Sequence, residues 1–179
     1  AGDGRRERYE KHARAAAGGS AVPVCLRPGE QGGAACGGGG NGGQNKEAPD
    51  LNKYYEDFMA SLGADNQPAM GDVEGEQLAA VYPGLENYAA KQSVLKMAMI
   101  SAVAFEFALV ELENEADAKA VADIFQARID YQIENGAFYP MTLEGWEQAE
   151  IVTQGNVVAL IVAQGSQDQA VDAFNALFA

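Results

Sequence analysis

One run of the sequence is apolar at every position, and it constrains the fold more than any other feature. Val157–Val162 reads Val-Val-Ala-Leu-Ile-Val. A strand that is apolar on both faces is typical of the centre of a sheet rather than its edge. Gly155-Asn156 stands directly before it, and such a pair favours a two-residue hairpin turn to a preceding strand over Ala149–Gln154. The sequence therefore predicts a β-hairpin that ends in a central strand.

A second pair of β-rich runs lies earlier, at Val94–Ile100 and Phe105–Leu112. The second run alternates, because successive side chains of a strand point to opposite faces. One face carries Phe105, Phe107 and Leu109, and the other carries Glu106, Ala108 and Val110.

Helical patterns surround the four predicted strands. Capping residues, apolar residues at helical spacing, and Gly or Pro stops mark these segments. They are a helix from Asp50 to Leu62 that stops at Gly63, a short helix over Glu76–Tyr82, a helix after Asn114–Asp117 that carries Val121, Ile124, Phe125, Ala127, Ile129 and Ile133 and stops near Asn135-Gly136, and a terminal helix after a capping box at Ser166–Gln169.

The order of elements predicts an α+β fold. We expect one antiparallel four-stranded sheet, in the order β-β-α-β-β-α, with helices packed on it and one or two short helices before it. Ala64–Met70 is expected to be a loop. Gly71–Glu76 carries three carboxylates but lacks the regular ligand spacing of a calcium loop, so we expect a solvated loop rather than a metal site. Residues expected in a shared core are Phe105, Phe107, Leu109, Ile124, Phe125, Ile151, Val158, Leu160, Phe174 and Leu177.

Small residues at Gly33-Ala34-Ala35 precede Cys36, and glycine, asparagine and glutamine follow it. This pattern resembles the cleavage and lipidation site of a bacterial lipoprotein. It implies lipid attachment at Cys36, a flexible tether over residues 36–49 and one globular domain over residues 50–179. The alternative is an ordinary glycine linker that contains an isolated cysteine.

Residues 1–35 lack the apolar core of a signal peptide. We expect a non-native or disordered leader, and codon degeneracy permits a specific origin. Tyr9-Glu10 can be encoded as TAT-GAR, which contains an ATG out of phase, and the alanine codons after it can become leucine codons in that frame. Under this hypothesis a signal-peptide region is read in the wrong frame. The alternative is a genuine basic N-terminal tail.

Charge and residue usage exclude several classes of function. From Cys36 onward, six basic residues stand against 22 acidic ones, so the formal net charge is −16. Nucleic acids and anionic lipid surfaces require clustered Lys and Arg, so we expect no nucleic-acid partner. No histidine and no further cysteine follow Cys36, which removes Ser-His and Cys-His nucleophiles and the usual zinc ligands. We therefore expect no metal, no cofactor and no catalytic residue.

The arrangement of several segments behind the Cys-Gly tether carries a family resemblance. These segments are Glu106–Leu112, Ala118–Val121, Arg128 with Gln132, Tyr139-Pro140, and the hairpin Ala149–Val162. From about Gly75 to Ala179 the chain resembles the lipoprotein family catalogued as domain of unknown function 4358. That resemblance implies a small secreted lipoprotein domain and transfers no activity, cofactor or catalytic residue.

Arg128 is the only arginine after Cys36, and Gln132 lies one helical turn later. A guanidinium can bind a ligand carboxylate in a forked geometry, but a salt bridge to Glu106 is the alternative. Tyr139 and Trp146, with Phe138, either form an aromatic recognition edge or cover the core. Arg128, Gln132, Tyr139 and Trp146 are thus the candidate binding residues.

Together these patterns predict a noncatalytic lipoprotein on the outer face of the cell membrane, anchored through Cys36, that binds a protein, peptide or envelope component. The alternative function is a hydrolase of cell-envelope or sugar substrates that works through paired carboxylates.

Overall fold

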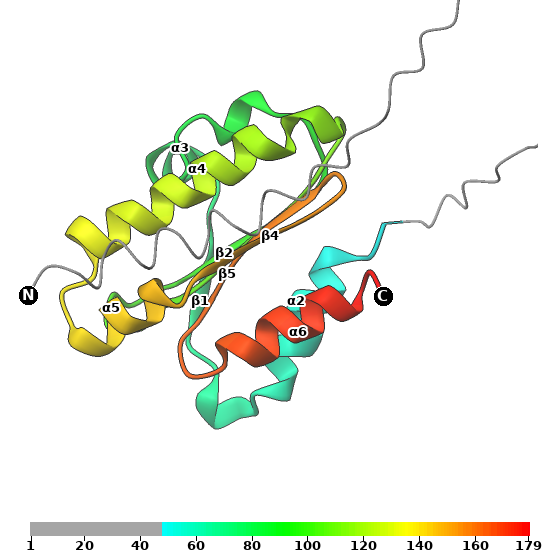
Figure 1. Cartoon of the computed structure of the whole chain (residues 1–179). Helices are drawn as coiled ribbons and strands as arrows, with labels where there is room; N and C mark the ends of the chain where they lie inside the picture. The colour runs from blue at the N-terminus through cyan, green and yellow to red at the C-terminus, as the bar shows by residue number, and fades with distance from the viewer. Residues whose placement is uncertain (1–47) are drawn as a thin grey trace, which may run out of the picture. The chain divides into compact units, whose positions relative to one another are not determined.

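The computed structural model describes residues 48–179, which lie within one compact unit, 45–179. The predicted leader, the predicted lipidation site at Cys36 and nearly all of the predicted tether lie outside the described residues. The described part is a mixed α+β fold in which helices cover both faces of an antiparallel sheet (Figure 1).

The sheet has five strands in the spatial order β1-β2-β3-β5-β4, and every neighbouring pair is antiparallel. The prediction of four strands was therefore wrong by one strand. The strands are β1 (Met70–Asp72), β2 (Ala90–Ala98), β3 (Phe105–Leu112), β4 (Glu150–Gln154) and β5 (Val157–Ala163).

The additional strand, β1, lies where the sequence predicted loops. It has only three residues and no alternating pattern of its own, and it pairs Met70 with Ala98 and Asp72 with Lys96 of β2. An ion pair between the side chains of Lys96 and Asp72 joins the two strands. A strand this short is specified by its neighbour rather than by its own residues, which is why periodicity does not reveal it.

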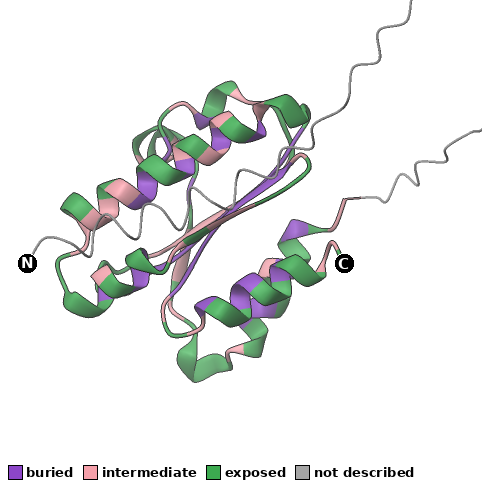
Figure 2. Ribbon diagram, in the orientation of Figure 1, coloured by how far each residue is buried: buried purple, intermediate pink, exposed green. Residues whose placement is uncertain are grey.

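Five α-helices pack on the sheet. Helices α2 and α6 lie on one face, and α3, α4 and α5 lie on the other (Figure 1). Figure 2 shows that the buried residues of these helices face the sheet, while the outer surfaces are exposed. The helices are α2 (Leu51–Ser61), α3 (Glu76–Val81), α4 (Ala118–Tyr131), α5 (Pro140–Glu147) and α6 (Gln167–Ala176).

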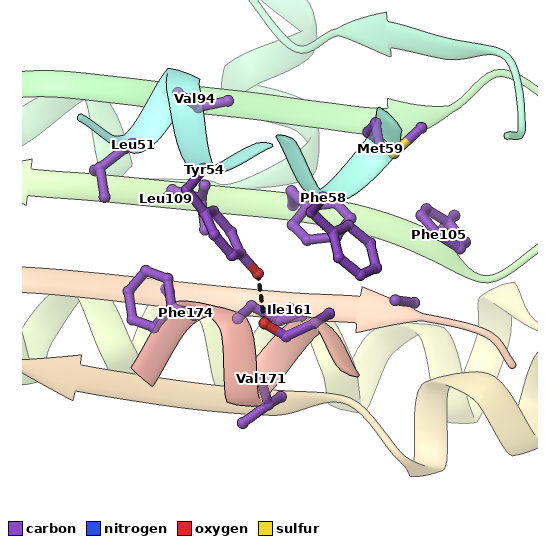
Figure 3. Packing of buried hydrophobic residues seen from close by; sticks show 14 of the residues in the cluster. Leu51, Tyr54, Phe58, Met59, Val94, Phe105, Leu109, Ile161, Val171 and Phe174 are labelled. Atoms are coloured by element: carbon purple, nitrogen blue, oxygen red, sulfur yellow. Dashed lines mark hydrogen bonds between the residues drawn. The ribbon is translucent and has the colours of Figure 1, made fainter. Parts of the chain in front are cut away.

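The sheet separates two cores rather than bordering a single shared one. The first core lies between the sheet and α2 with α6 (Figure 3), where the Tyr54 hydroxyl donates a hydrogen bond of 2.7 Å to the carbonyl of Ala170. Phe107 of β3 packs against Tyr54 and Phe58 in this layer. The second core lies under α4, where Phe125 is fully buried and its ring meets Tyr82 edge to face.

Most of the predicted core residues are buried, and β3 and β5 are buried at every position. The exceptions are Ile124, Ile151 and Leu177, which are only partly buried. Ile151 lies on the edge strand β4, and Leu177 follows the last residue of α6, so each has neighbours on fewer sides. Ala127, one of the apolar residues of the predicted helical pattern, is exposed.

Two helix starts differ in outcome. The cap at Asp50 is confirmed, because its carboxylate accepts a hydrogen bond of 3.0 Å from the backbone N–H of Lys53. The capping box at Ser166 is wrong, because that side chain makes no capping bond. The side chain of Gln167 instead turns back to β5, donating to the carbonyl of Ile161 and accepting from the N–H of Ala163, both at 2.9 Å.

Candidate functional site

A buried ion pair joins the centre of the sheet to α4. The alternation of β3 turns Glu106 toward the layer of α3, α4 and α5, and only 1% of this residue is exposed. Arg128, on the buried face of α4, donates from Nε to Oε1 at 2.9 Å and from Nη2 to Oε2 at 2.8 Å. Two parallel hydrogen bonds of this kind fix the direction of both side chains.

Three further side chains complete this polar cluster. The Tyr82 hydroxyl donates to Oε1 of Glu106 at 2.5 Å. With its amide oxygen turned to the guanidinium, Gln132 accepts from Nη1 and Nη2 of Arg128 at 2.8 and 2.9 Å. The ring of Trp146, on α5, lies 5.4 Å from the Arg128 Cζ, which is the distance of a cation–π contact. The cluster therefore links four parts of the fold. They are β3, α4, α5 and Tyr82, the residue that follows α3.

The last turn of this helical stretch is a π-helix over Gln132–Gly136 that continues α4. Gly136 lacks a side chain where space is occupied, since a Cβ there would lie 2.6 Å from the side-chain Cδ of Gln132. The glycine that the sequence marks as a helix stop thus also makes room for Gln132 beside Arg128.

The environment of the cluster shifts two protonation equilibria. Burial, together with the negative charge and hydrogen bond of Glu106, raises the pKa of Tyr82 well above its ordinary value. Burial alone acts to lower the pKa of Arg128, but the hydrogen bond and charge of Glu106 outweigh it and raise that pKa. Arg128 is therefore charged and Tyr82 neutral over the physiological pH range.

Three of the four candidate binding residues are thus brought together. Arg128, Gln132 and Trp146 meet, but the guanidinium fork ends on the buried carboxylate of Glu106, so the salt-bridge interpretation of Arg128 is confirmed. Trp146, only 4% exposed, covers the second core. Tyr139 lies apart from the cluster and is 56% exposed.

A second feature was mostly missed by sequence reasoning. All the large apolar side chains that are exposed in the described residues lie in two segments, the β2–β3 loop and the stretch from the end of α4 to the start of α5. We call this set the apolar end patch. Its members are Met99, Ile100, Tyr131, Phe138, Tyr139 and Met141.

The two segments meet at one end of the sheet. The Thr142 hydroxyl of α5 donates a hydrogen bond of 3.0 Å to the carbonyl of Ala102 in the β2–β3 loop. Gly145 lies so close to Ala104 that a Cβ on it would come within 2.6 Å of the Ala104 Cβ. The sequence patterns predicted no helix over 136–148, whereas α5, with Pro140 in its first turn, forms there and brings its start against the β2–β3 loop.

The described chain begins at the opposite end of the sheet. Gln92, near the start of β2, donates to the carbonyl of Pro49 at 2.9 Å and accepts from the N–H of Leu51 at 3.0 Å. Asn156, in the β4–β5 turn, donates to the carbonyl of Leu112 at this same end. The eight residues of β3 span about 25 Å at the usual rise of a strand, so the patch and the entry of the chain are separated by the length of the sheet.

No group of three or more His, Cys, Asp or Glu side chains within 48–179 is placed to hold a metal ion. None of the helices in that part of the chain combines the length and apolar character that spanning a membrane requires.

Comparison with known proteins gives one match. A family model with the description "Domain of unknown function (DUF4358)" matches residues 63–163, which is more than half of the chain. No curated protein and no solved structure matches significantly.

Proposed function

Because this chain belongs to the family described as Domain of unknown function (DUF4358), a description that states no activity, we propose its function from its own residues. It is a noncatalytic binding domain, held to the outer face of the cell membrane by a lipid on Cys36, that recognises a protein, peptide or envelope component through the apolar end patch.

The apolar end patch is the observation that supports this proposal. Phe138 is 82% exposed, Met99 71% and Met141 68%, although the large apolar side chains outside the patch in residues 48–179 are all buried or partly buried. Exposed apolar side chains gathered in one place mark interaction surfaces, since their exposure to water is unfavourable for a protein with no partner. Tyrosine, phenylalanine and methionine are also the residue types enriched at binding interfaces.

The buried polar cluster supports a structural rather than a catalytic role for its carboxylate. Glu106 has one oxygen engaged by Tyr82 and Arg128 and the other engaged by Arg128. A general acid or nucleophile needs a carboxylate that can reach substrate. No observed geometry favours the alternative of a hydrolase, which would need two accessible acids on either side of a bond.

The position of the patch fits an anchored protein. A tether that joins the domain at Pro49 reaches the end of the sheet opposite to the patch. An anchor at Cys36 would therefore leave the patch free to meet a partner beyond the membrane surface.

Two experiments on the full chain in its producing cell test the proposal. Labelling with an alkyne fatty acid should modify the wild-type protein and not Cys36→Ser. A photo-cross-linking amino acid in place of Phe138 should give a discrete cross-linked product, whereas the same amino acid in place of Thr153, exposed on the edge strand β4, should not. The product should disappear when Ile100 and Met141 are both changed to Ser. Equal cross-linking from the two positions, or its survival in the double variant, would contradict the binding role.

A further inference from the structure

The charged residues on the α4–α5 side of the apolar end patch are all acidic. Residues 129–150, which include the end of α4 and all of α5, contain Asp130, Glu134, Glu144, Glu147 and Glu150 and no Lys or Arg. Glu134 and Glu144 are exposed. The cation nearest to them in sequence, Arg128, is buried and paired with Glu106. The patch is therefore an apolar surface with carboxylates beside it on the α4–α5 side and no Lys or Arg in that stretch of the sequence.

The other half of the patch is uncharged. The segment 97–104, which carries Met99 and Ile100, has no Asp, Glu, Lys or Arg. The negative charge thus lies on the α4–α5 side, next to Phe138, Tyr139 and Met141. A partner that covers the whole patch meets apolar side chains on one side and apolar side chains mixed with carboxylates on the other.

Two possible occupants are disfavoured by the same charges. A second copy of the chain would bring its own carboxylates against these, and like charges placed together across an interface oppose association. An anionic bilayer attracts basic segments and repels acidic ones. The formal net charge of −16 from Cys36 onward opposes both contacts at longer range as well.

We propose that the apolar end patch binds a basic amphipathic segment of another protein, one that presents apolar side chains with Lys or Arg beside them. Its apolar side chains cover Ile100 together with Met99 and Met141, whose flexible methionine side chains accommodate varied shapes. Its cations meet Glu134 and Glu144 and lie over the faces of Phe138 or Tyr139, since aromatic rings attract cations. This inference rests on the proposed binding function and adds the chemistry of the partner.

The test uses synthetic peptides as probes. A fluorescent amphipathic helical peptide of leucine and lysine is compared with peptides of the same length in which glutamine or glutamate replaces lysine. Binding is followed by anisotropy at about 0.15 M salt, where exposed charges separated by more than about 8 Å are largely screened. The Leu/Lys peptide should bind most tightly, and the Leu/Glu peptide should not bind.

Paired variants separate the patch from bulk charge. Phe138→Ser with Met141→Ser should weaken binding of the Leu/Lys peptide about tenfold or more, as loss of central apolar contacts does. Glu134→Gln with Glu144→Gln should weaken it several-fold, whereas Asp168→Asn with Asp172→Asn, an equal loss of exposed charge on α6, should leave it unchanged. Circular dichroism and melting temperature confirm that each variant is folded.

Several results would overturn the inference. Equal weakening by the α6 control shows attraction by bulk charge alone, and no effect of the patch variant shows that the peptide binds elsewhere. The wild type is also tested for binding to vesicles of phosphatidylglycerol and phosphatidylethanolamine and for dimerisation in sedimentation velocity. If either occurs and the patch variant abolishes it, the patch has an occupant other than a basic segment. Equal binding of the Leu/Gln peptide through the patch rejects the basic partner but leaves the proposed binding function standing. Absence of position-dependent cross-linking in the cell rejects that function itself.

Discussion

Glu106 and Arg128 lie 22 residues apart in sequence and face each other through two parallel hydrogen bonds, with Nε to Oε1 at 2.9 Å and Nη2 to Oε2 at 2.8 Å. The pair fixes α4 to the central strand β3. Trp146 extends the contact to α5 by lying over the guanidinium. The cluster therefore connects β3 to both α4 and α5. Phe138 and Tyr139 are exposed in the segment between these two helices.

Removal of one member of this pair should strongly destabilise the fold. Arg128→Met leaves the carboxylate of Glu106 buried without its cation, and such changes typically lower the free energy of unfolding by about 3–5 kcal/mol. Lys119→Met, which removes the exposed pair with Asp123, should lower it by less than about 1 kcal/mol. Urea denaturation followed by circular dichroism measures both changes.

Two related variants define the role of the pair. Arg128→Lys keeps the charge but not the fork, so it should lower the melting temperature while leaving binding at the apolar end patch unaltered. Arg128→Met combined with Glu106→Gln should be less destabilised than Arg128→Met alone, because no unpaired charge stays buried. An Arg128→Lys protein that is as stable as the wild type but binds more weakly would contradict the structural role. It would instead support the interpretation that Arg128 binds a ligand.

Alkaline pH should destabilise the protein through Tyr82. Its pKa in the fold is raised, by burial first and by Glu106 second, above the ordinary value of about 10 for tyrosine. The unfolded chain therefore loses this proton first as the pH rises. The contribution of the neutral hydroxyl is fully present below about pH 10 and falls at higher pH. Denaturation curves from about pH 8 to about pH 11 should show this loss.

Variants of single tyrosines assign the effect. Tyr82→Phe should be less stable by about 1–3 kcal/mol at about pH 8, since a hydrogen bond to a charged group is lost, and its stability should fall less steeply above about pH 10. Tyr131→Phe, at a residue 57% exposed, should match the wild type at both pH values. An unchanged alkaline slope in Tyr82→Phe would assign the loss to another group, such as the buried Tyr54, whose pKa burial also raises.

The fold was largely predictable where periodicity is strong. The alternation of Phe105 and Phe107 with Glu106 and Ala108 correctly assigned each to its face, and the run Val157–Val162 lies next to β3 inside the sheet. Neither pattern predicts that helices cover both faces, because an apolar strand does not indicate which elements pack against it. The strand β1 and the helix α5 escaped detection because β1 has three residues and α5 eight, too few for a strand or helical period alone to stand out.

The candidate site was predictable only in part. Arg128 and Glu106 were found because an isolated cation in an acidic domain must pair with a carboxylate. Tyr82 was not, since nothing in its sequence context indicates that its hydroxyl reaches Glu106 across 24 residues. Met99 and Met141 were also missed, because an exposed methionine in a loop has the same local sequence pattern as one that turns inward.

The side chain of Gln167 should contribute measurably to the connection between β5 and α6. It is only 7% exposed and makes two hydrogen bonds with the backbone of β5. Gln167→Ala removes the side-chain partner of the buried Ala163 N–H and one of the bonds to the Ile161 carbonyl, and an unsatisfied buried group costs about 1–3 kcal/mol. Gln169→Ala, at an exposed position on the same helix, should cost less than about 0.5 kcal/mol. Equal stability of the two variants in thermal unfolding would show that water replaces the bonds of Gln167.

Phe125 and Phe138 should respond oppositely to truncation, because one fills the core and the other lies in the patch. Phe125 is fully buried against Tyr82, and Phe125→Ala should lower the free energy of unfolding by about 3–5 kcal/mol through lost burial and the cavity that remains. Phe138→Ala, at a residue 82% exposed, should change it by less than about 0.5 kcal/mol. Chemical denaturation measures both values, and the peptide-binding assay should show the reverse order, with Phe138→Ala the weaker binder. A loss below about 1 kcal/mol for Phe125→Ala would place its ring outside the core, and a large loss for Phe138→Ala would show that this ring supports the fold rather than a partner.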